Sequence, residues 1–246
     1  MKRTDIEQKI ELRALSIRQQ LNPSNDTPFD IIKAVLLIPG LSLSFAPLSE
    51  NISGICYKDL NLLIVNYKQS YGRTRFTIAH ELYHYFVEDS KNNTVISSLL
   101  LEKRNKEEKY ADIFASYLLA PREEFLLFLE SLITPKGICI EDIVKIEQHF
   151  QMSRHSTLIR LQIEGCLDQP SFEQYSQGAM SQARLYGYSD KLYKPLYDKP
   201  TTLGHYVVMA NELFKNDLIT KSKRNELLLD GFRDDIVFGE NGEIND

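Results

Sequence analysis

The stretch FTIAHELYHYF, residues 76–86, is the most informative part of the chain. It places His80 and His84 four residues apart, with Glu81 directly after the first histidine. On a helix this spacing stacks the two imidazoles on one face, where both rings can reach a single metal ion. A glutamate in the second position is placed to act as a general base. The pattern therefore predicts a metal site, provided that the segment is helical.

The surrounding residues meet that condition. The run from 71 to 88 contains no proline and no glycine after Gly72. Apolar residues recur in it at helical spacing: Phe76, Ala79, Leu82, Tyr83, Phe86 and Val87. We therefore expect a helix over about residues 71–88 that carries both histidines on one face.

The composition is that of a soluble globular protein, with 246 residues, 43% hydrophobic and 26% charged. No run of 18 apolar residues is present, and the opening MKRTDIEQKIELRAL carries charges where a secretory signal needs an apolar stretch. We therefore expect a cytoplasmic location and no membrane contact. The net charge of −5 is accounted for by residues 230–246, which hold six acids and one arginine. The near-neutral remainder does not favour direct nucleic-acid binding.

The order of local patterns predicts an α+β fold, a mostly helical core with a small antiparallel sheet. Strand-like runs begin at Leu41, Ile52 and Asn61, and the last two are joined by the short link KDLN, as in a hairpin. The predicted helices cover residues 5–21, 107–120, 121–132, 141–150 and 153–165. The three cysteines, Cys56, Cys139 and Cys166, show no paired spacing and are interpreted as small buried apolar residues.

The last two of these helices, joined by QMS, resemble a helix-turn-helix in outline. Residues 141–164 hold four acids against three basic residues, so packing onto the preceding part of the chain is favoured over DNA binding. After Pro170 tyrosines and prolines alternate with polar residues, and a helical pattern resumes at 201. We therefore expect a first domain over residues 1–168 and a helical extension with an acidic tail over 169–246.

A catalytic metal site of this kind needs a third protein ligand, and the helix predicted over 107–120 offers two glutamates. Glu108 shares one helical stripe with Asp112, two alanines and a leucine, whereas Glu107 is rotated about 100° away from it. Glu108 is thus the predicted ligand, with Glu107 as the alternative. Asp112, one turn further, is placed to accept the second N–H of a ligating histidine.

The stretches RTRFTIAHELYHYF (73–86) and EKYADIFASYLLAP (108–121) resemble the paired signature of the ImmA/IrrE metallopeptidases. That signature reads R-x-R-F-T-x-A-H-E-x-x-H and then E-x-x-A-[ND]-x-F-A-x-x-L-L-x-P, and HFQMSRHSTLIRL (149–161) is similar to a third family segment. The resemblance implies a zincin-like core and a cytoplasmic, Zn²⁺-dependent endopeptidase. It also implies a protein substrate, often a repressor encoded nearby, here expected to be a helix-turn-helix (XRE-type) repressor or antitoxin.

Several features of the site stay open at this stage. Tyr83 stands where the family usually has glycine and is expected to narrow the cleft, and Met152 replaces a valine. Residues 61–67 are the predicted strand along which an extended substrate binds. The donor to the tetrahedral oxyanion is one of four candidates: Tyr71, Tyr110, His149 and His155.

A different class of function is also compatible with the histidine pair. The protein could be a regulatory binding module of a repressor or toxin-antitoxin pair that keeps a metal for stability and has no proteolytic turnover. A structural metal site needs the histidines but has no use for a base, so the presence of Glu81 favours the enzyme.

Overall fold

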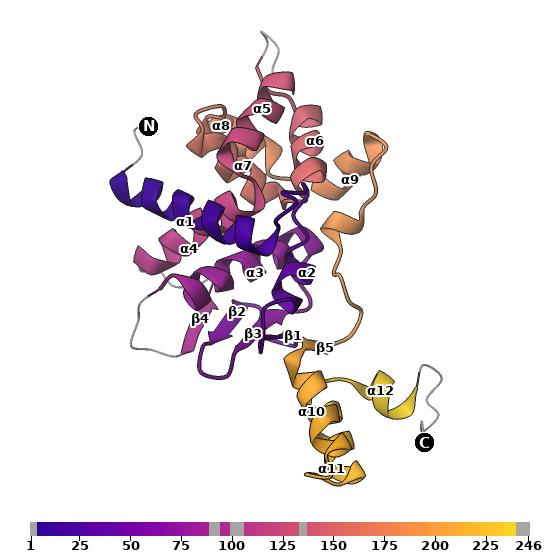
Figure 1. Ribbon diagram of the computed structural model, residues 1–246. Coiled ribbons are helices and arrows are strands. Elements are labelled where there is room, and N and C mark those ends of the chain that lie inside the picture. The colour runs from indigo at the N-terminus through magenta and orange to yellow at the C-terminus, as the bar shows by residue number, and fades with distance from the viewer. Residues whose placement is uncertain (1–3, 89–93, 99–105, 133–136, 240–246) are drawn as a thin grey trace.

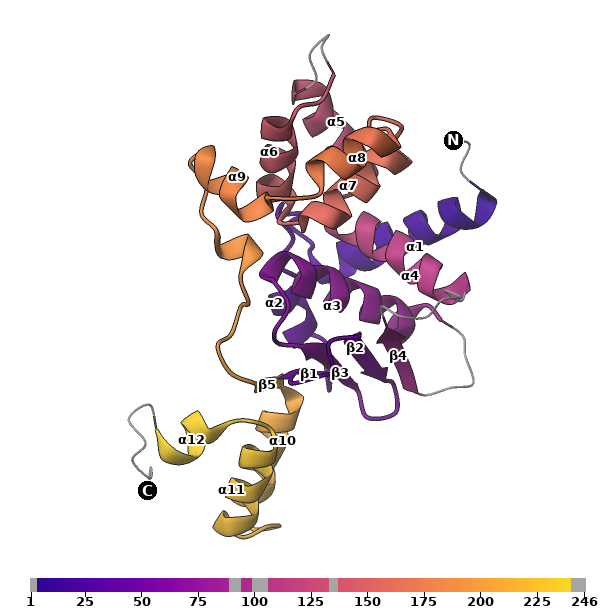
Figure 2. The same ribbon diagram turned by 180° about the vertical axis from the view of Figure 1, so that it is seen from behind.

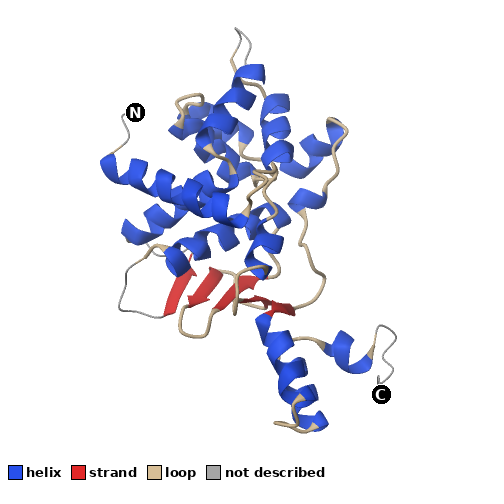
Figure 3. Ribbon diagram, in the orientation of Figure 1, coloured by secondary structure: helices blue, strands red, loops and turns tan. Residues whose placement is uncertain are grey.

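The computed structural model describes residues 4–88, 94–98, 106–132 and 137–239 (Figure 1). Its sheet has the strand order β4-β2-β3-β1-β5. The strands are β1 (Ser42–Ala46), β2 (Ile52–Tyr57), β3 (Leu62–Asn66), β4 (Thr94–Ser98) and β5 (Thr201–Gly204). Figure 3 shows that helices cover one face of this sheet, and that the parts of the molecule at both ends, away from the sheet, are helical. The predicted α+β class is confirmed.

The sheet is mixed, and the prediction of an antiparallel sheet is wrong for one pair of strands. β2 and β3 form the predicted antiparallel hairpin, with Cys56 opposite Leu63. β1 pairs with β3 in parallel, with Leu43 opposite Leu63. The physical reason is the strand order. The chain passes from β1 to β2 without pairing them, and β3 then returns into the position between them. β3 is therefore antiparallel to β2 and parallel to β1.

Both outer strands were missed in the sequence. The segment from Ser90 reads as a polar linker, yet β4 begins at Thr94 and pairs with β2. The sequence from Thr201 reads as the start of a helix, yet residues 201–204 form β5 and pair with β1, with Leu203 opposite Leu43. The helical pattern is correct only from His205, where α10 (His205–Lys215) begins.

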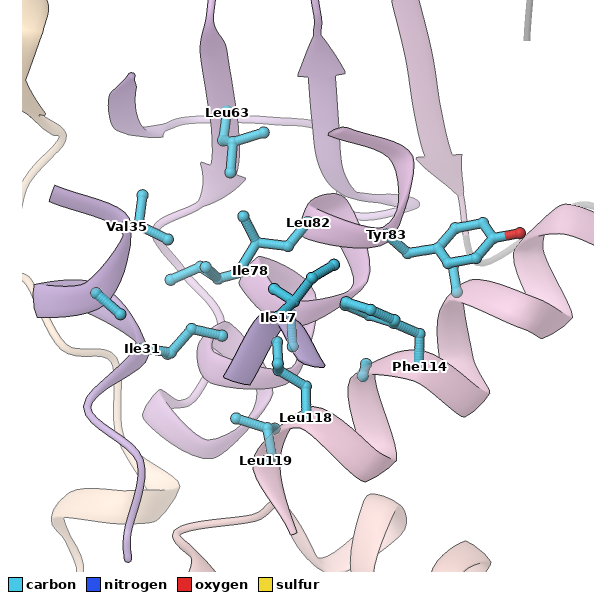
Figure 4. Close-up of a cluster of buried hydrophobic side chains, with 14 of the residues drawn as sticks. Ile17, Ile31, Val35, Leu63, Ile78, Leu82, Tyr83, Phe114, Leu118 and Leu119 are labelled. Atoms are coloured by element: carbon cyan, nitrogen blue, oxygen red, sulfur yellow. The ribbon is translucent and has the colours of Figure 1, made fainter. Parts of the chain in front are cut away.

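The helix α3 (Tyr71–Phe86) packs on the sheet, with the short α2 (Ile31–Leu36) beside it. α4 (Lys106–Leu119) packs on α3, and α1 (Asp5–Leu21) packs on α4, so that these helices and the sheet enclose the main core. α1 covers the predicted residues 5–21 and begins with a capping box between Thr4 and Glu7. Figure 4 shows Leu82 of α3 and Phe114 of α4 among the buried side chains of this core. Burying such a side chain stabilises the fold by about 1.5–3 kcal/mol.

A second helical layer has its own core around Phe125, Phe150 and Leu158. Its helices are α5 (Arg122–Leu132), α6 (Ile140–Phe150), α7 (Arg154–Ile163), α8 (Gln169–Tyr175) and α9 (Ala179–Leu185). α7, the second helix of the helix-turn-helix outline, buries most of its length, and Arg160 donates to the Ser116 hydroxyl of α4 at 2.9 Å. The predicted packing of this helix pair onto the preceding part of the chain is confirmed.

The chain after residue 168 returns to the sheet before it forms a separate unit. It runs through α8, α9 and the 3₁₀ turn η1 (Lys191–Tyr193) down one side of the molecule to β5 (Figure 2). The Tyr71 N–H donates to the Lys194 carbonyl at 2.7 Å. Only α10, α11 (Lys221–Asp230) and α12 (Asp234–Phe238) share a small core of their own. The boundary at 168/169 stays a prediction.

Two further expectations concern the cysteines and membranes. Cys56 is fully buried, as predicted, but Cys139 is exposed and Cys166 partly exposed, so the prediction is wrong for these two. Within the described ranges no helix has the length and apolar character that a membrane span requires.

Candidate metal centre

The helix α3 lies between the sheet and α4 and holds the His-Glu-x-x-His residues inside the protein. His80 is 7% exposed, and Glu81 and His84 are fully buried. Gly72 lets the start of α3 approach the second helical layer, because a Cβ there would lie 2.9 Å from the Ser153 nitrogen. The predicted helix is therefore present, and its histidine face is turned toward α4.

The two imidazoles are oriented by carboxylates on their Nδ1 atoms. His80 Nδ1 lies 3.0 Å from Asp112 Oδ1, and His84 Nδ1 lies 2.6 Å from Glu88 Oε2. A carboxylate at Nδ1 accepts the ring proton there and leaves Nε2 as the atom with a lone pair for a metal. Asp112 lies where the sequence placed it. Glu88 was missed, although its i+4 spacing from His84 was a readable signal.

The Nε2 atoms of both histidines point at each other and at Glu108. They are 3.2 Å apart, and Glu108 places Oε2 at 3.3 Å from His80 Nε2 and Oε1 at 3.5 Å from His84 Nε2. The ligand atoms of these three residues lie within 4.8 Å of one another. The structure thus brings together the three residues that the sequence nominated as ligands.

Nearby carboxylates favour a positive charge within the cluster of His80, His84 and Glu108. Burial lowers the pKa of His80, but the hydrogen bonds to Asp112 and Glu108 outweigh it and raise that pKa to about 10. The pKa of His84 is lowered by burial and by its neighbour His80. Burial raises the pKa of Glu108, yet its contact with His80 outweighs burial, and the net pKa is lowered. A cation between these residues would meet a carboxylate that is already ionised.

The helical repeat of α4 turns the side chains of Glu108 and Glu107 in different directions. Glu107 accepts a hydrogen bond from the Tyr83 hydroxyl at 2.6 Å and lies outside the cluster of nitrogen and oxygen atoms. Tyr83 is 4% exposed and packs edge-on against Phe114, among the core side chains of Figure 4. The expectation that Tyr83 narrows the cleft is wrong, because its ring is turned into the core.

Glu81 is held against the sheet by a close contact that the sequence did not predict. A Cβ at Gly54 of β2 would lie 2.5 Å from Glu81 Oε1 and 2.8 Å from Thr77 Cγ2. No side chain other than hydrogen fits between β2 and α3 at this point. Gly54 therefore allows the carboxylate of Glu81 to lie beside the histidines on a rigid support.

These residues open into a cavity of about 490 Å³, which we call the cleft. It is lined by α3, α4, α7 and the segment after residue 168, and its lining includes His80, Glu81, Glu108, Asp112, Arg73, Phe76, Ile113, Arg154, His155, Ile159, Ile163, Ser176, Ala179 and Tyr193. The residues from 176 to 193 thus form one wall of the cleft. This wall lies outside the first predicted domain.

Of the four candidate oxyanion donors, only His155 lines the cleft. His149 stacks on Phe128 with a 4.0 Å centroid distance, Tyr110 lines a different cavity, and Tyr71 lies beside the guanidinium of Arg75. The three are therefore poorly placed for this role. Tyr193 lines the cleft but was not predicted, because its position depends on the return of the distant segment that carries it.

The predicted substrate strand is also corrected by the sheet order. Residues 62–66 form β3, which lies between β2 and β1 and has both edges paired. Its backbone groups are therefore already used and cannot receive an extended peptide. The outer strand on the Gly54 side is β4, which pairs with β2.

The donor set fits a catalytic metal. Two imidazole nitrogens and one carboxylate oxygen are the ligand types of the His₂Glu class, with a carboxylate, Glu81, directly beside them. The Cys56 thiol is no candidate, because burial and nearby Glu81 raise its pKa to about 12. A buried helix with the His-Glu-x-x-His pattern, together with a carboxylate from the next helix as the third ligand, defines a class of metallopeptidases.

The comparison with protein families agrees with this class. Residues 40–162 match the peptidase M78 family, described as the IrrE N-terminal-like domain, and the chain belongs to this family of ImmA/IrrE metallopeptidases. No curated protein matched the chain in the search. The matched region contains the whole cluster of His80, His84 and Glu108 but ends before the 176–193 wall of the cleft.

Proposed function

We propose that this protein is a zinc-dependent endopeptidase that makes one site-specific cut in a partner protein. The observation that carries the proposal is the convergence of His80, His84 and Glu108 within 4.8 Å, beside Glu81 and at the wall of a cleft. Zinc is the metal that two imidazoles and one carboxylate hold in peptidases of this kind, and imidazole ligands suit it well. In this proposal His80, His84 and Glu108 are the ligands, and Glu81 is the catalytic base.

The residues of the chain divide the work of peptide hydrolysis. Bound zinc supplies Lewis-acid chemistry, which lowers the pKa of water toward about 7 and polarises a carbonyl. Glu81 accepts a proton from the attacking water at its carboxylate and returns it to the leaving amine nitrogen. Asp112 and Glu88 hold the two imidazoles in the tautomer that presents Nε2. The absence of a side chain at Gly54 leaves the space that the Glu81 carboxylate occupies.

The shape of the site supports selective cleavage over general digestion. The base is fully buried and the cleft is walled by four segments, so only an extended, flexible stretch of substrate can reach it. The backbone edge of β4, next to β2, is the corrected candidate for pairing with such a stretch. The family resemblance supports a helix-turn-helix repressor of the XRE type, encoded nearby, as the partner. We place the reaction in the cytoplasm, where such a repressor acts.

Incubation of the enzyme with that repressor and, separately, with casein tests the proposal. We expect one cut in the repressor, in a flexible or helix-linking segment, and no efficient degradation of casein. A zinc chelator and the Glu81→Gln substitution should each abolish the cut. Unselective degradation of casein, or repressor cleavage that persists in the Glu81→Gln variant, would contradict the proposal.

A further inference from the structure

Two arginines line the cleft, and only one of them is fully used by the protein itself. Arg154 pairs with Glu147 and also donates to the Tyr175 carbonyl and to Gln182 Oε1, each at 2.7 Å. These bonds connect α6 and α7 to the cleft wall after residue 168, so Arg154 has a structural role. Its donors are turned toward the protein and have little capacity for a ligand.

Arg73 differs from Arg154 in its hydrogen-bond and ion-pair partners. It is half-buried in the lining of the cleft and donates to the Ser53 hydroxyl at 3.3 Å. Within the described part of the chain no carboxylate lies in ion-pair distance of it, and burial alone lowers its pKa. A guanidinium offers five N–H donors and stays charged at neutral pH. Arg73 therefore presents a partly desolvated positive charge with spare donors to whatever enters the cleft.

The neighbouring Arg75 shows that the spare donors of Arg73 depend on its position along α3. Arg75 is fully buried and donates to the Phe29 carbonyl at 2.7 Å and to the Gln151 carbonyl at 3.0 Å. Because Arg75 is two positions further along α3 than Arg73, its side chain points away from the cleft and toward the contact between the two helical layers. The structure thus assigns Arg75 a role in packing and leaves Arg73 on the substrate side.

The distance along α3 relates Arg73 to the reaction centre. Arg73 lies seven residues before His80, which is about 10 Å along a helix at about 1.5 Å per residue. An extended peptide advances about 3.3 Å per residue, so about three residues span this distance. A substrate side chain that contacts Arg73 therefore belongs to a residue about three positions from the cut bond.

The cleft that Arg73 lines also contains apolar side chains. Phe76 follows it on α3, and Ile113, Ile159 and Ile163 come from α4 and α7. A charged partner beside these side chains is shielded from water, which strengthens its attraction to a guanidinium. A basic or neutral side chain in the same place would leave Arg73 desolvated and unpaired.

We propose that Arg73 is a specificity-determining residue, which selects substrates with a glutamate or aspartate about three positions to one side of the cut bond. The inference rests on the proposed peptidase function and adds the substrate class. The same cleft accepts bulky apolar side chains next to the acidic one, through Phe76 and the three isoleucines.

A binding selection tests this without relying on turnover. The probe is a displayed library of random twelve-residue peptides, presented to the zinc-loaded Glu81→Gln protein. We expect the selected peptides to share one acidic position beside an apolar one. Selected peptides without an acidic position, or no selection above background, would overturn the inference.

Variants of Arg73 then make the test specific. Arg73→Gln should weaken binding of a selected acidic peptide about tenfold, as expected for loss of a charge-assisted hydrogen bond, and leave its Glu-to-Gln analogue unchanged. Arg73→Glu should shift the preference to lysine at that position, with zinc content unchanged. Arg13→Gln and Arg13→Glu, on the exposed side of α1, are matched controls and should leave the preference as it was.

The outcomes separate this inference from the proposed function. Wild-type cleavage of selected peptides without dependence on the acidic residue would contradict the role of Arg73 and leave the peptidase intact. Acid-dependent binding without any cleavage by the wild-type protein would contradict the peptidase alone. An equal loss of kcat for acidic and neutral peptides in Arg73→Gln would contradict the inference, because it would show that Arg73 stabilises the oxyanion.

Discussion

Gly54→Ala is the substitution that most directly probes how Glu81 is held. The new Cβ would lie 2.5 Å from Glu81 Oε1 and 2.8 Å from Thr77 Cγ2, whereas such atoms normally stay about 3.5 Å apart. Thr77 is β-branched and stiff within α3, and Glu81 is fully buried, so the carboxylate must move by about 1 Å. A displacement of that size at a reacting group costs about 100-fold in rate.

The same overpacking should lower the free energy of unfolding by about 1–3 kcal/mol. The melting temperature should fall by about 2–4 °C for each kcal/mol in a chain of this length. The assays are kcat/KM for cleavage of the proposed repressor substrate, metal content and a thermal melt. Metal content should be unchanged, because the atoms nearest to the added Cβ belong to Glu81 and Thr77, and neither residue is a proposed ligand.

Gly165→Ala is the matched control. Gly165 has φ +77° and nothing within 4 Å of an added Cβ, so alanine there strains the backbone by about 1–2 kcal/mol without touching the site. It should lower the melting temperature and leave kcat/KM intact. Full activity of a metal-loaded Gly54→Ala protein would refute the reasoning about Glu81.

Three further predictions concern the ligands, pH and the extension. Glu108→Ala should weaken metal binding at least 100-fold more than Glu107→Ala in equilibrium dialysis. Equal losses of metal affinity would contradict the assigned orientation of these two glutamates on α4. Burial lowers the pKa of His80, but Asp112 and Glu108 raise it from 6.5 to about 10, so metal affinity should rise about tenfold per pH unit over that range in chelator competition. In the metal-free protein, the stability from the charged imidazole is complete below pH 6.5 and is lost as pH rises through 10. Deleting 169–246 should destabilise the protein more than deleting 205–246 in urea unfolding, because only the first deletion removes β5 and the cleft wall.

The helices of the site could be predicted from the sequence because their signals are local. Apolar spacing and the absence of proline set α3, and the helical repeat alone distinguished Glu108 from Glu107. Asp112 followed from the same repeat. Each of these positions depends on neighbours within two turns of one helix, which a sequence displays directly.

What the sequence did not reveal depends on pairings between distant segments. β5 pairs with β1 across more than 150 residues, and its four residues carry no alternating pattern to indicate a strand. The role of Gly54 appears only when β2 lies against α3, and Tyr193 reaches the cleft only because its segment returns to the sheet. Parallel pairing of β1 with β3 was missed for the same reason, since strand direction depends on the order in which strands assemble.

The central claim is that His80, His84 and Glu108 hold a metal on which Glu81 acts as base. The most direct measurement combines metal content with repressor cleavage in the wild type, Glu81→Gln and His84→Ala proteins. We predict about one zinc per chain in the wild type and in Glu81→Gln, none in His84→Ala, and cleavage by the wild type alone. Full zinc occupancy in His84→Ala, or a repressor cut by Glu81→Gln, would contradict the claim.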